Sequence, residues 1–305
     1  MGAVASACAG GGTRDPAAPG PYGVGETVKT FTRNSSTTGE PRVLDTVIWY
    51  PTDGSSQGGP ERDAAPATSG GPFPVVMFSH GACGKPTQST YFTEHLVSWG
   101  FVVVAPPHPG NLEDDCPCDT VCLIASSRNR SDDITFALDS VLALADDPSE
   151  PIGAIIDPER TAATGFSFGG LTALGTVPEG RFHAVVALAP GAPSLLIDAA
   201  SRTRVPAMLM AGGEDLAVDS DEVGQLYEAL PHDIPRYLIL LPEAGHHAFQ
   251  DECTVLCDFP QERAHELVNR YATAFLETYL VGDEEYSRYL ERAEAPDALL
   301  THDGE

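Results

Sequence analysis

Basic side chains are scarce in this sequence of 305 residues. Lysine and arginine together number 17 against 44 aspartates and glutamates, and Lys29 and Lys85 are the only lysines. The formal net charge of −27 gives a surface that repels phosphate backbones and anionic lipids. The composition therefore argues against nucleic-acid binding and favours a well-solvated acidic surface without a specific charged partner.

Long apolar runs are missing as well. No stretch contains the roughly 18 consecutive apolar residues of a membrane-spanning helix, so we expect no transmembrane segment. With 42% hydrophobic residues, the chain can bury one large core. We expect a monomer with a disordered N-terminal tail at residues 1–21, one large domain at 22–282 and an acidic C-terminal tail at 283–305.

The predicted N-terminal tail contains one cysteine. The segment Val4–Cys8 resembles the end of a bacterial lipoprotein signal, in which small residues precede a cysteine that is lipidated after cleavage. The basic and apolar segments that usually come before such a cysteine are missing. Cys8 is therefore a candidate lipid anchor, and the alternative is a featureless disordered tail.

The sequence has seven cysteines, more than is usual for a cytosolic enzyme of this size. Five of them form two tight groups, Cys116, Cys118 and Cys122, and then Cys253 and Cys257. Without Cys8 an even number remains, which favours disulfides and a location outside the cytoplasm, although the spacing does not give the connectivity. A zinc site is the alternative, but neither group has the usual Cys-x-x-Cys spacing, so we expect no metal.

Short apolar runs alternate with helical segments along most of the chain. Such runs are typical of strands that are buried on both faces of a parallel sheet, which predicts a mostly parallel α/β fold with helices on both faces. The segment Val43–Tyr50 alternates instead and predicts an antiparallel strand near a sheet edge. The predicted buried strands are Pro74–Ser79, Phe101–Ala105, Thr161–Gly165, Ala184–Ala189, Ala207–Ala211 and Tyr237–Leu241. The predicted helices are Thr90–Trp99, Asp132–Ala145, Gly169–Thr176, Ser220–Ala229 and Gln261–Tyr279.

The segment Gly165–Gly170 reads Gly-Phe-Ser-Phe-Gly-Gly and lies between a predicted strand and a predicted helix. A serine in a Gly-x-Ser-x-Gly turn of this kind projects above the sheet, and the glycines let the chain pass without side-chain clashes. The N-terminus of the following helix favours developing negative charge. The bare pattern is weak, but its place between strand and helix favours Ser167 as a nucleophile.

The loop Ser79–Gly84 follows an earlier apolar strand. In hydrolases with such a serine turn, the developing oxyanion is held by the N–H after the nucleophile and by an N–H from a loop of this kind. Phe168 and Ala82 are the two candidate donors. Cys83 is a candidate substrate contact, and we expect the ring of His80 to hold the loop by hydrogen bonds rather than to act as a base.

A candidate acid and a candidate base follow later strands. The apolar run from Ala207 ends in a glycine turn that contains Asp215, our candidate acid. The strand ending at Leu241 leads to two adjacent histidines, which the sequence alone does not separate. We favour His246 as the base and His247 as a loop or substrate-contact residue. The order serine, aspartate, histidine along the chain is the one that the α/β-hydrolase fold uses.

Residues 40 to 280 are similar to several esterase families. The segments Phe73–Gly84, Glu94–Val104, Gly165–Gly170 and Val205–Asp215 resemble bacterial cutinases and polyester hydrolases, platelet-activating-factor acetylhydrolases and predicted dienelactone-hydrolase-like esterases. His246–Asp251 resembles the His-x-x-Phe-x-Asp pattern of the acetylhydrolases, which supports His246. The resemblance implies the α/β-hydrolase fold, while the serine nucleophile argues against a true dienelactone hydrolase.

One departure from the polyester hydrolases concerns Leu188–Gly191, where those enzymes usually have a tryptophan. The chain between Ala189 and Ala207 is also too short for a lid domain, so we expect an open site. The insertion Asn111–Arg130 and the loop after His246 contain the two cysteine groups and are candidates for a disulfide-pinned rim of the site.

The sequence thus predicts a serine carboxylic-ester hydrolase without a cofactor, acting through an acyl-enzyme on short- to medium-chain esters. The alternatives are a cutinase-like polyester hydrolase, a phospholipid acetylhydrolase, an amidase or peptidase with the same residues, and a non-catalytic binding protein on the same fold. The expected partner is a small-molecule or polymeric ester.

Overall fold

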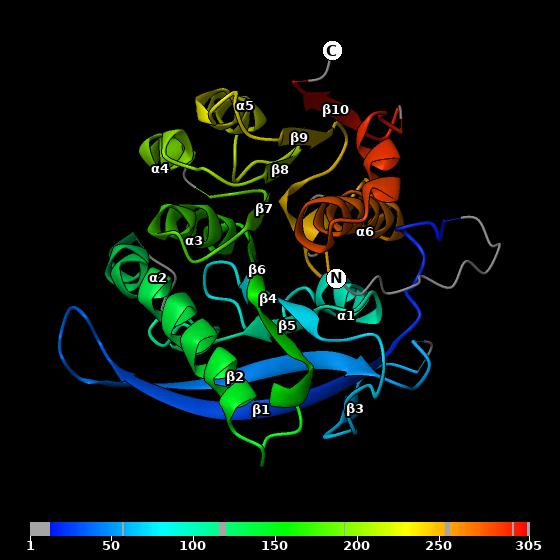
Figure 1. Cartoon of the computed structure of the whole chain (residues 1–305). Helices are drawn as coiled ribbons and strands as arrows, with labels where there is room; N and C mark the ends of the chain where they lie inside the picture. Colours follow the sequence, from blue (N-terminus) through cyan, green and yellow to red (C-terminus); the bar gives the residue numbers. More distant parts are fainter. Residues whose placement is uncertain are drawn as a thin grey trace.

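A twisted sheet of ten strands runs through the part of the chain that the structure describes (Figure 1). The computed structural model describes residues 13–56, 58–115, 120–191, 193–253, 257–294 and 296–303. The strands lie in the order β10-β9-β8-β7-β6-β4-β5-β2-β1-β3. Their bounds are β1 Gly23–Asn34, β2 Pro41–Thr52, β3 Glu61–Arg62, β4 Phe73–Ser79, β5 Val102–Ala105, β6 Ile156–Phe166, β7 Ala184–Leu188, β8 Ala207–Gly212, β9 Arg236–Leu241 and β10 Leu299–His302.

The central strands β5, β4, β6, β7, β8 and β9 are parallel to one another. Every residue of β4, β5, β7 and β8 is buried, as the continuous apolar runs predict for strands that are covered on both faces. β2 is antiparallel to both β1 and β5. The predicted mostly parallel sheet with helices on both faces is confirmed.

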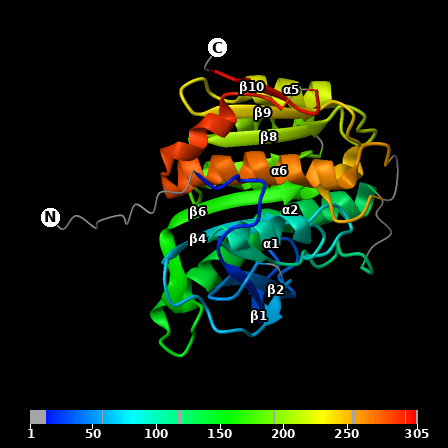
Figure 2. The same ribbon diagram turned by 90° about the vertical axis from the view of Figure 1, so that its right-hand side faces the viewer.

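Helices cover both faces of the sheet. α1 and α6 lie on one face, and α2, α3, α4 and α5 lie on the other (Figure 1). Figure 2 looks onto the face that α1 and α6 cover. The bounds are α1 Thr90–Ser98, α2 Thr120–Leu142, α3 Phe168–Thr176, α4 Ile197–Ser201, α5 Ser220–Ala229 and α6 Gln261–Leu276. Short 3₁₀ turns and one π turn complete the fold at Ala143–Asp146, Gly153–Ile155, Val177–Glu179, Pro193–Leu196, His246–Phe249, Glu284–Leu290 and, for the π turn, Glu277–Val281.

Successive residues of a strand supply the two separate cores. Phe78 of β4 packs in one apolar cluster with Phe92 of α1 and Phe275 of α6. Its neighbour Met77 packs in the other cluster with Leu138 of α2. Because each such buried side chain contributes about 2 kcal/mol, the two clusters fix the sheet between its helical layers and hold the ends of the strands in place.

Three strands, β1, β3 and β10, were not predicted from the sequence. β3 has only two residues, both exposed, and pairs parallel with β1. β1 pairs with β2 along its whole length and is half-exposed. Polar residues interrupt its sequence, so it contains no continuous apolar run. β10 lies within the predicted acidic tail and pairs antiparallel with β9. A short edge strand of this kind is held by backbone hydrogen bonds and needs no apolar pattern, so the segment around Leu299–His302 is not frayed.

The helix predicted at Asp132 begins twelve residues earlier, at Thr120. The second half of the insertion Asn111–Arg130 is therefore helical. The polar run Ser126–Ser131 hides the periodicity of this helix in the sequence, although its residues are compatible with helical backbone. None of the helices in the described residues is long and apolar enough to cross a membrane.

The described part of the predicted N-terminal tail, residues 13–21, lies against the end of α1. His95 donates a hydrogen bond from Nε2 to the carbonyl of Pro16 at 2.8 Å, and the indole N–H of Trp99 donates to the carbonyl of Ala18 at 2.9 Å. These contacts order a segment whose composition alone predicts no structure. Cys8 lies outside the described residues.

The cysteines are oxidised wherever the structure describes them. Cys253 and Cys257 form a disulfide with a Cα–Cα distance of 5.7 Å. Cys83 and Cys122 are also disulfide-bonded. Bonded sulfurs supply no thiolates, which removes the zinc alternative for these four residues, and no group of three or more metal-ligating side chains is found among the described residues. Cys116 and Cys118, the other predicted members, lie outside the described residues.

Candidate active site

Ser167 occupies the turn between the end of β6 and the start of α3. Its backbone dihedrals, φ 56° and ψ −118°, lie in a region that side chains rarely adopt. The end of β7 holds this turn, because the Ser167 N–H donates to the carbonyl of Leu188 at 2.8 Å and the Gly191 N–H donates to the carbonyl of Ser167 at 2.9 Å. The strained turn presents the serine side chain at the carboxyl edge of the sheet.

Two glycines of the motif are required by the close approach of neighbouring backbone. A Cβ atom on Gly169 would lie 1.8 Å from the carbonyl oxygen of Ser79. A Cβ on Gly165 would lie 2.4 Å from the backbone of Gly169. The motif therefore lets α3 start directly against the end of β4, and this contact brings Ser167 next to the loop that follows β4.

His246 lies between Ser167 and Asp215. The Ser167 hydroxyl donates to His246 Nε2 at 2.9 Å, and His246 Nδ1–H donates to Asp215 Oδ2 at 2.7 Å. The other carboxylate oxygen of Asp215 accepts hydrogen bonds at 2.8 Å from the N–H groups of Ala217 and Val218. This carboxylate fixes the tautomer of His246, so that Nε2 faces the serine as a proton acceptor.

The neighbouring His247 makes different contacts. Its Nδ1 accepts a hydrogen bond from the Gln250 side chain at 2.6 Å, and its ring meets that of His246 edge to face. Burial and the adjacent His246 lower the pKa of His247. The structure thus brings His246, and not His247, into hydrogen-bonding distance of both Ser167 and Asp215. The role of His247 as a substrate contact stays a prediction.

The loop after β4 carries the predicted donor Ala82. The loop is held on both sides of it. Gly81 N–H donates to the Gln88 side chain at 2.7 Å, and His80 bonds through one ring nitrogen to the Gly81 carbonyl at 2.8 Å. The other ring nitrogen of His80 accepts from the backbone N–H of His108 at 3.2 Å. The predicted structural role of His80 is confirmed.

Phe168, the second predicted donor, is the first residue of α3. Helix N–H groups in the first turn have no intrahelical acceptor, so the N–H of Phe168 is available to a bound oxygen. The two predicted donors thus lie at the start of α3 and on the loop after β4, two segments that Gly169 keeps in contact.

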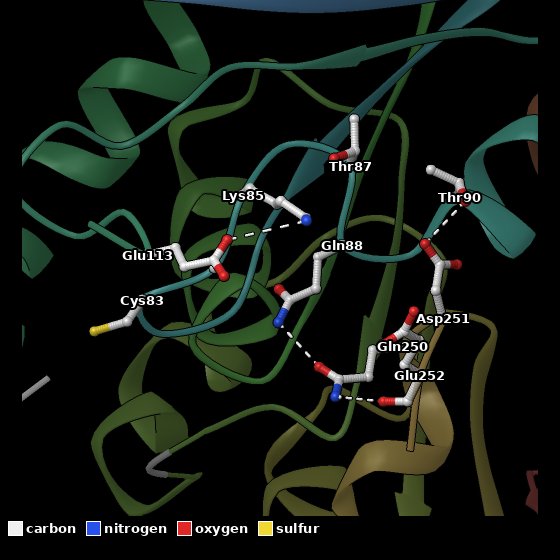
Figure 3. Close-up of a pocket in the computed structure, with 10 residues that line it drawn as sticks. Cys83, Lys85, Thr87, Gln88, Thr90, Glu113, Gln250, Asp251 and Glu252 are labelled. Atoms are coloured by element: carbon white, nitrogen blue, oxygen red, sulfur yellow. Dashed lines mark hydrogen bonds and ion pairs between the residues drawn. The ribbon is translucent and has the colours of Figure 1, made fainter. Parts of the chain in front are cut away.

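A polar cavity of about 640 Å³ lies between the loop after β4 and the loop after His246 (Figure 3). Gln88 and Gln250 join the two loops by a side-chain hydrogen bond of 3.0 Å, and Thr90 donates to Asp251 at 2.8 Å. Cys83, predicted as a substrate contact, lines this cavity as part of a disulfide. The lining residues are Cys83, Gly84, Lys85, Thr87, Gln88, Thr90, Glu113, Gln250, Asp251 and Glu252.

Several residues that support the site were not singled out from the sequence. Gln88 and Gln250 join the two loops, and Asp251 accepts a hydrogen bond from the Tyr91 N–H at 2.9 Å in the first turn of α1. In the sequence, Asp251 is the last residue of the His-x-x-Phe-x-Asp pattern that begins at His246. That pattern was the available signal, since an aspartate at a fixed distance after a histidine can anchor the histidine loop to a helix N-terminus.

Comparisons with known proteins match most of the chain. The model of the PETase family, described as PET hydrolase-like, matches residues 17–302 and extends into both predicted tails. Platelet-activating factor acetylhydrolase of Cavia porcellus is 23% identical over 289 residues. This match covers 79% of the present chain and 65% of the acetylhydrolase, so the chain spans about two thirds of the length of that relative.

Proposed function

Because the chain belongs to the PET hydrolase-like family of α/β-hydrolases, we propose that it hydrolyses carboxylic esters with Ser167 as nucleophile, His246 as general base and Asp215 as the orienting acid. The observation that carries this proposal is the continuous hydrogen-bonded series from Ser167 through His246 to Asp215. It starts at Ser167, whose strained backbone, with φ at 56°, is typical of a nucleophile on a strand-to-helix turn.

In the acylation step His246 Nε2 takes the hydroxyl proton while Ser167 Oγ bonds to the ester carbonyl carbon. The carbonyl electron pair moves to oxygen, and the N–H groups of Ala82 and Phe168 stabilise that oxyanion. When the oxyanion collapses, the bond to the alcohol oxygen breaks and His246 returns its proton to the leaving alcohol. The products are an acyl-Ser167 ester and a free alcohol.

Water completes the cycle. His246 removes a proton from water, the hydroxide attacks the acyl carbon, and the second oxyanion expels Ser167, which regains the proton from His246. The charge of Asp215 stabilises the imidazolium that forms in each half-reaction. Besides the ester and one water molecule, the two steps need no further reactant.

We propose short- to medium-chain esters as the substrate class. In support, only 18 residues separate the end of β7 from the start of β8, too few for a lid domain, and they contain a 3₁₀ turn and the short helix α4. The lack of tryptophan in Leu188–Gly191 argues against the polyester alternative.

A phospholipid acetylhydrolase is the second candidate, favoured by the similarity to the Cavia porcellus protein and by the His-x-x-Phe-x-Asp pattern at His246–Asp251. A panel of p-nitrophenyl esters from acetate to palmitate, run beside a polyester film and a 2-acetyl phosphatidylcholine, separates these substrates. We expect the largest kcat/KM on acetate to octanoate. Preferred release from the film or from the phospholipid would replace the proposal with that alternative.

The two other classes are tested in the same assay. An amidase or peptidase would cleave anilides at rates comparable to the matching esters, and a non-catalytic binding protein would turn over none of the panel. We expect ester turnover alone, because an alkoxide leaving group needs less assistance than an amine.

We also propose that the protein functions outside the cytoplasm. The oxidised state of Cys83, Cys122, Cys253 and Cys257 supports this location, since disulfides persist in oxidising compartments. Fractionation of expressing cells tests it, with Cys8→Ser as the variant that distinguishes lipid anchoring from simple secretion. Recovery of the protein in the cytoplasmic fraction alone would contradict the proposal.

A further inference from the structure

Arg130 of α2 is a buried cation, and its hydrogen-bond partners among the described residues are all neutral groups. The side chain is among the largest in the protein that are fully buried, at 1% exposure of the residue. Its guanidinium donates to Thr172 Oγ1 at 2.9 Å, to Asn111 Oδ1 at 2.7 Å, to Ser79 Oγ at 3.1 Å and to the carbonyl oxygen of His80. Burying a charge is unfavourable unless its donors are satisfied, and the four acceptors satisfy donors of this guanidinium. An apolar side chain would fill the same space without this cost, so packing alone does not explain an arginine here.

Three of the partners of Arg130, Ser79, His80 and Thr172, belong to the two segments that carry the proposed oxyanion donors. His80 stands two residues before Ala82, in the loop after β4. Thr172 lies in the first turns of α3, and the ring of Phe168 lies 4.6 Å from the guanidinium carbon. One rigid, planar group therefore contacts both halves of the proposed oxyanion hole at once.

A second buried Ser-His-Asp series fixes the same region from behind. The Ser79 hydroxyl donates to His108 Nε2 at 2.9 Å, and His108 Nδ1–H donates to Asp133 at 3.1 Å. Arg33 and Arg42 of the β1–β2 ribbon bond to this carboxylate at 2.7 and 2.6 Å. Burial and Arg130 lower the pKa of His108 to about 3, which keeps its ring neutral.

This second series does not reach solvent, because Ser79, His108 and Asp133 are each 0% exposed. No substrate carbonyl can approach Ser79. The series instead holds the Ser79 hydroxyl in one orientation, with its hydrogen toward His108 and a lone pair toward Arg130. Arg130 is therefore fixed by residues of three other segments: the end of β4 with the loop after it, the loop after β5, and α3.

We propose that Arg130 is the positioning residue of the oxyanion hole, holding the loop after β4 and the first turn of α3 so that the N–H groups of Ala82 and Phe168 converge on one oxygen. This role rests on the proposed ester hydrolysis. Oxyanion donors act mainly in the transition state, where charge develops on the carbonyl oxygen. Displacement of one donor therefore lowers kcat and leaves KM nearly unchanged.

The test compares Arg130→Met, Arg130→Lys and Thr172→Val with the parent protein on p-nitrophenyl butyrate. We expect kcat to fall about 100-fold for Arg130→Met, about tenfold for Arg130→Lys and about threefold for Thr172→Val, with KM within about twofold of the parent. The inhibition constant of an alkyl boronic acid, which forms a tetrahedral adduct with the serine, should rise by the same factors. A structural defect alone would instead reduce the amount of active protein without changing KM, kcat per active site or the inhibition constant.

Arg236→Lys is the matched control, because Arg236 is 3% exposed and its guanidinium is bonded to Asp303 and Tyr227 near the far edge of the sheet. Its kcat per active site, titrated with a fluorophosphonate, should equal that of the parent. If Arg130→Met does not fold, Thr172→Val decides, and an unchanged kcat with an unchanged inhibition constant overturns the proposal. Failure of the proposed function is distinct from this result, since the parent protein would then show no hydrolysis that depends on Ser167.

Discussion

Asp215 Oδ2 lies 2.7 Å from His246 Nδ1, and Asp215 Oδ1 accepts two backbone hydrogen bonds from the turn that follows β8. The aspartate is thus held at both oxygens, and its side chain is 1% exposed while that of His246 is 14% exposed. The carboxylate can orient the imidazole without movement, and the imidazole remains accessible to a substrate and to water. Each prediction on the mechanism depends on this arrangement.

Replacing Asp215 by asparagine removes the charge and leaves the shape. We expect Asp215→Asn to lower kcat by about four orders of magnitude with little effect on folding, because the amide favours the wrong tautomer of His246. The measurement is steady-state hydrolysis of p-nitrophenyl butyrate together with circular dichroism. Asp219→Asn is the control on the same segment, since the Asp219 side chain caps α5 by accepting a hydrogen bond from the Asp221 N–H. Loss of activity in both variants to the same extent would contradict the assignment.

The two adjacent histidines should respond very differently to substitution. His246→Gln should lower kcat by about four orders of magnitude or more, because no other group accepts the Ser167 proton. His247→Gln should lower kcat by less than about tenfold, since His247 bonds to Gln250 rather than to Ser167. A larger loss for His247→Gln than for His246→Gln would reverse their roles.

The disulfide between Cys253 and Cys257 closes a short loop that follows the histidine turn. Replacing both cysteines by serine should lower the free energy of unfolding by about 2 kcal/mol, because the reduced unfolded chain gains conformational freedom. Urea denaturation of the two proteins measures the difference. Peptide mapping of the unreduced parent should show Cys253, Cys257, Cys83 and Cys122 oxidised, and free thiols at these positions would sink this expectation.

Glu277 should make the stability of the protein depend on pH. Burial and the nearby Asp283 raise the pKa of this glutamate to about 8 in the folded state, above its usual value near 4.5. Its contribution to stability is therefore fully present below pH 4.5 and is lost as the pH rises through about 8. Glu277→Gln removes this dependence, so its stability relative to the parent should rise by about 5 kcal/mol between pH 4.5 and pH 9. Glu284→Gln, an exposed neighbour, should show no such trend, and parallel pH profiles for the parent and Glu277→Gln would refute the effect.

The buried strands could be predicted because they form uninterrupted apolar runs, and the turn at Ser167 could be predicted because its chemistry requires glycines at fixed positions. β1 could not be predicted in this way. Gly23–Asn34 is half-exposed, and its polar residues leave no continuous apolar run. The first half of α2 was hidden by its polar residues. In this half of the helix, Asn129 accepts a hydrogen bond from Ser35 and Arg130 donates one to Asn111. Such tertiary contacts cannot be read from the local sequence.

The network around Arg130 was also not predicted, although one signal was present. Arg130 and Asp133 lie at helical spacing from Ile134, Ala137 and Leu138, on the side of α2 that faces the core. Polar residues on the apolar face of a helix indicate buried partners. His108 lies 25 residues before Asp133 and Ser79 lies 51 residues before Arg130, so no local pattern could identify these partners.

The most direct test of the account is the site of covalent labelling by a fluorophosphonate, measured by peptide mass spectrometry on the parent protein and on Ser167→Ala. If Ser167 is the nucleophile, the reagent forms one adduct per molecule, on the peptide that contains Ser167. Ester hydrolysis is then lost in proportion to labelling. Ser167→Ala should neither react nor hydrolyse esters. An adduct at another residue, or hydrolysis that survives in Ser167→Ala, would contradict the account.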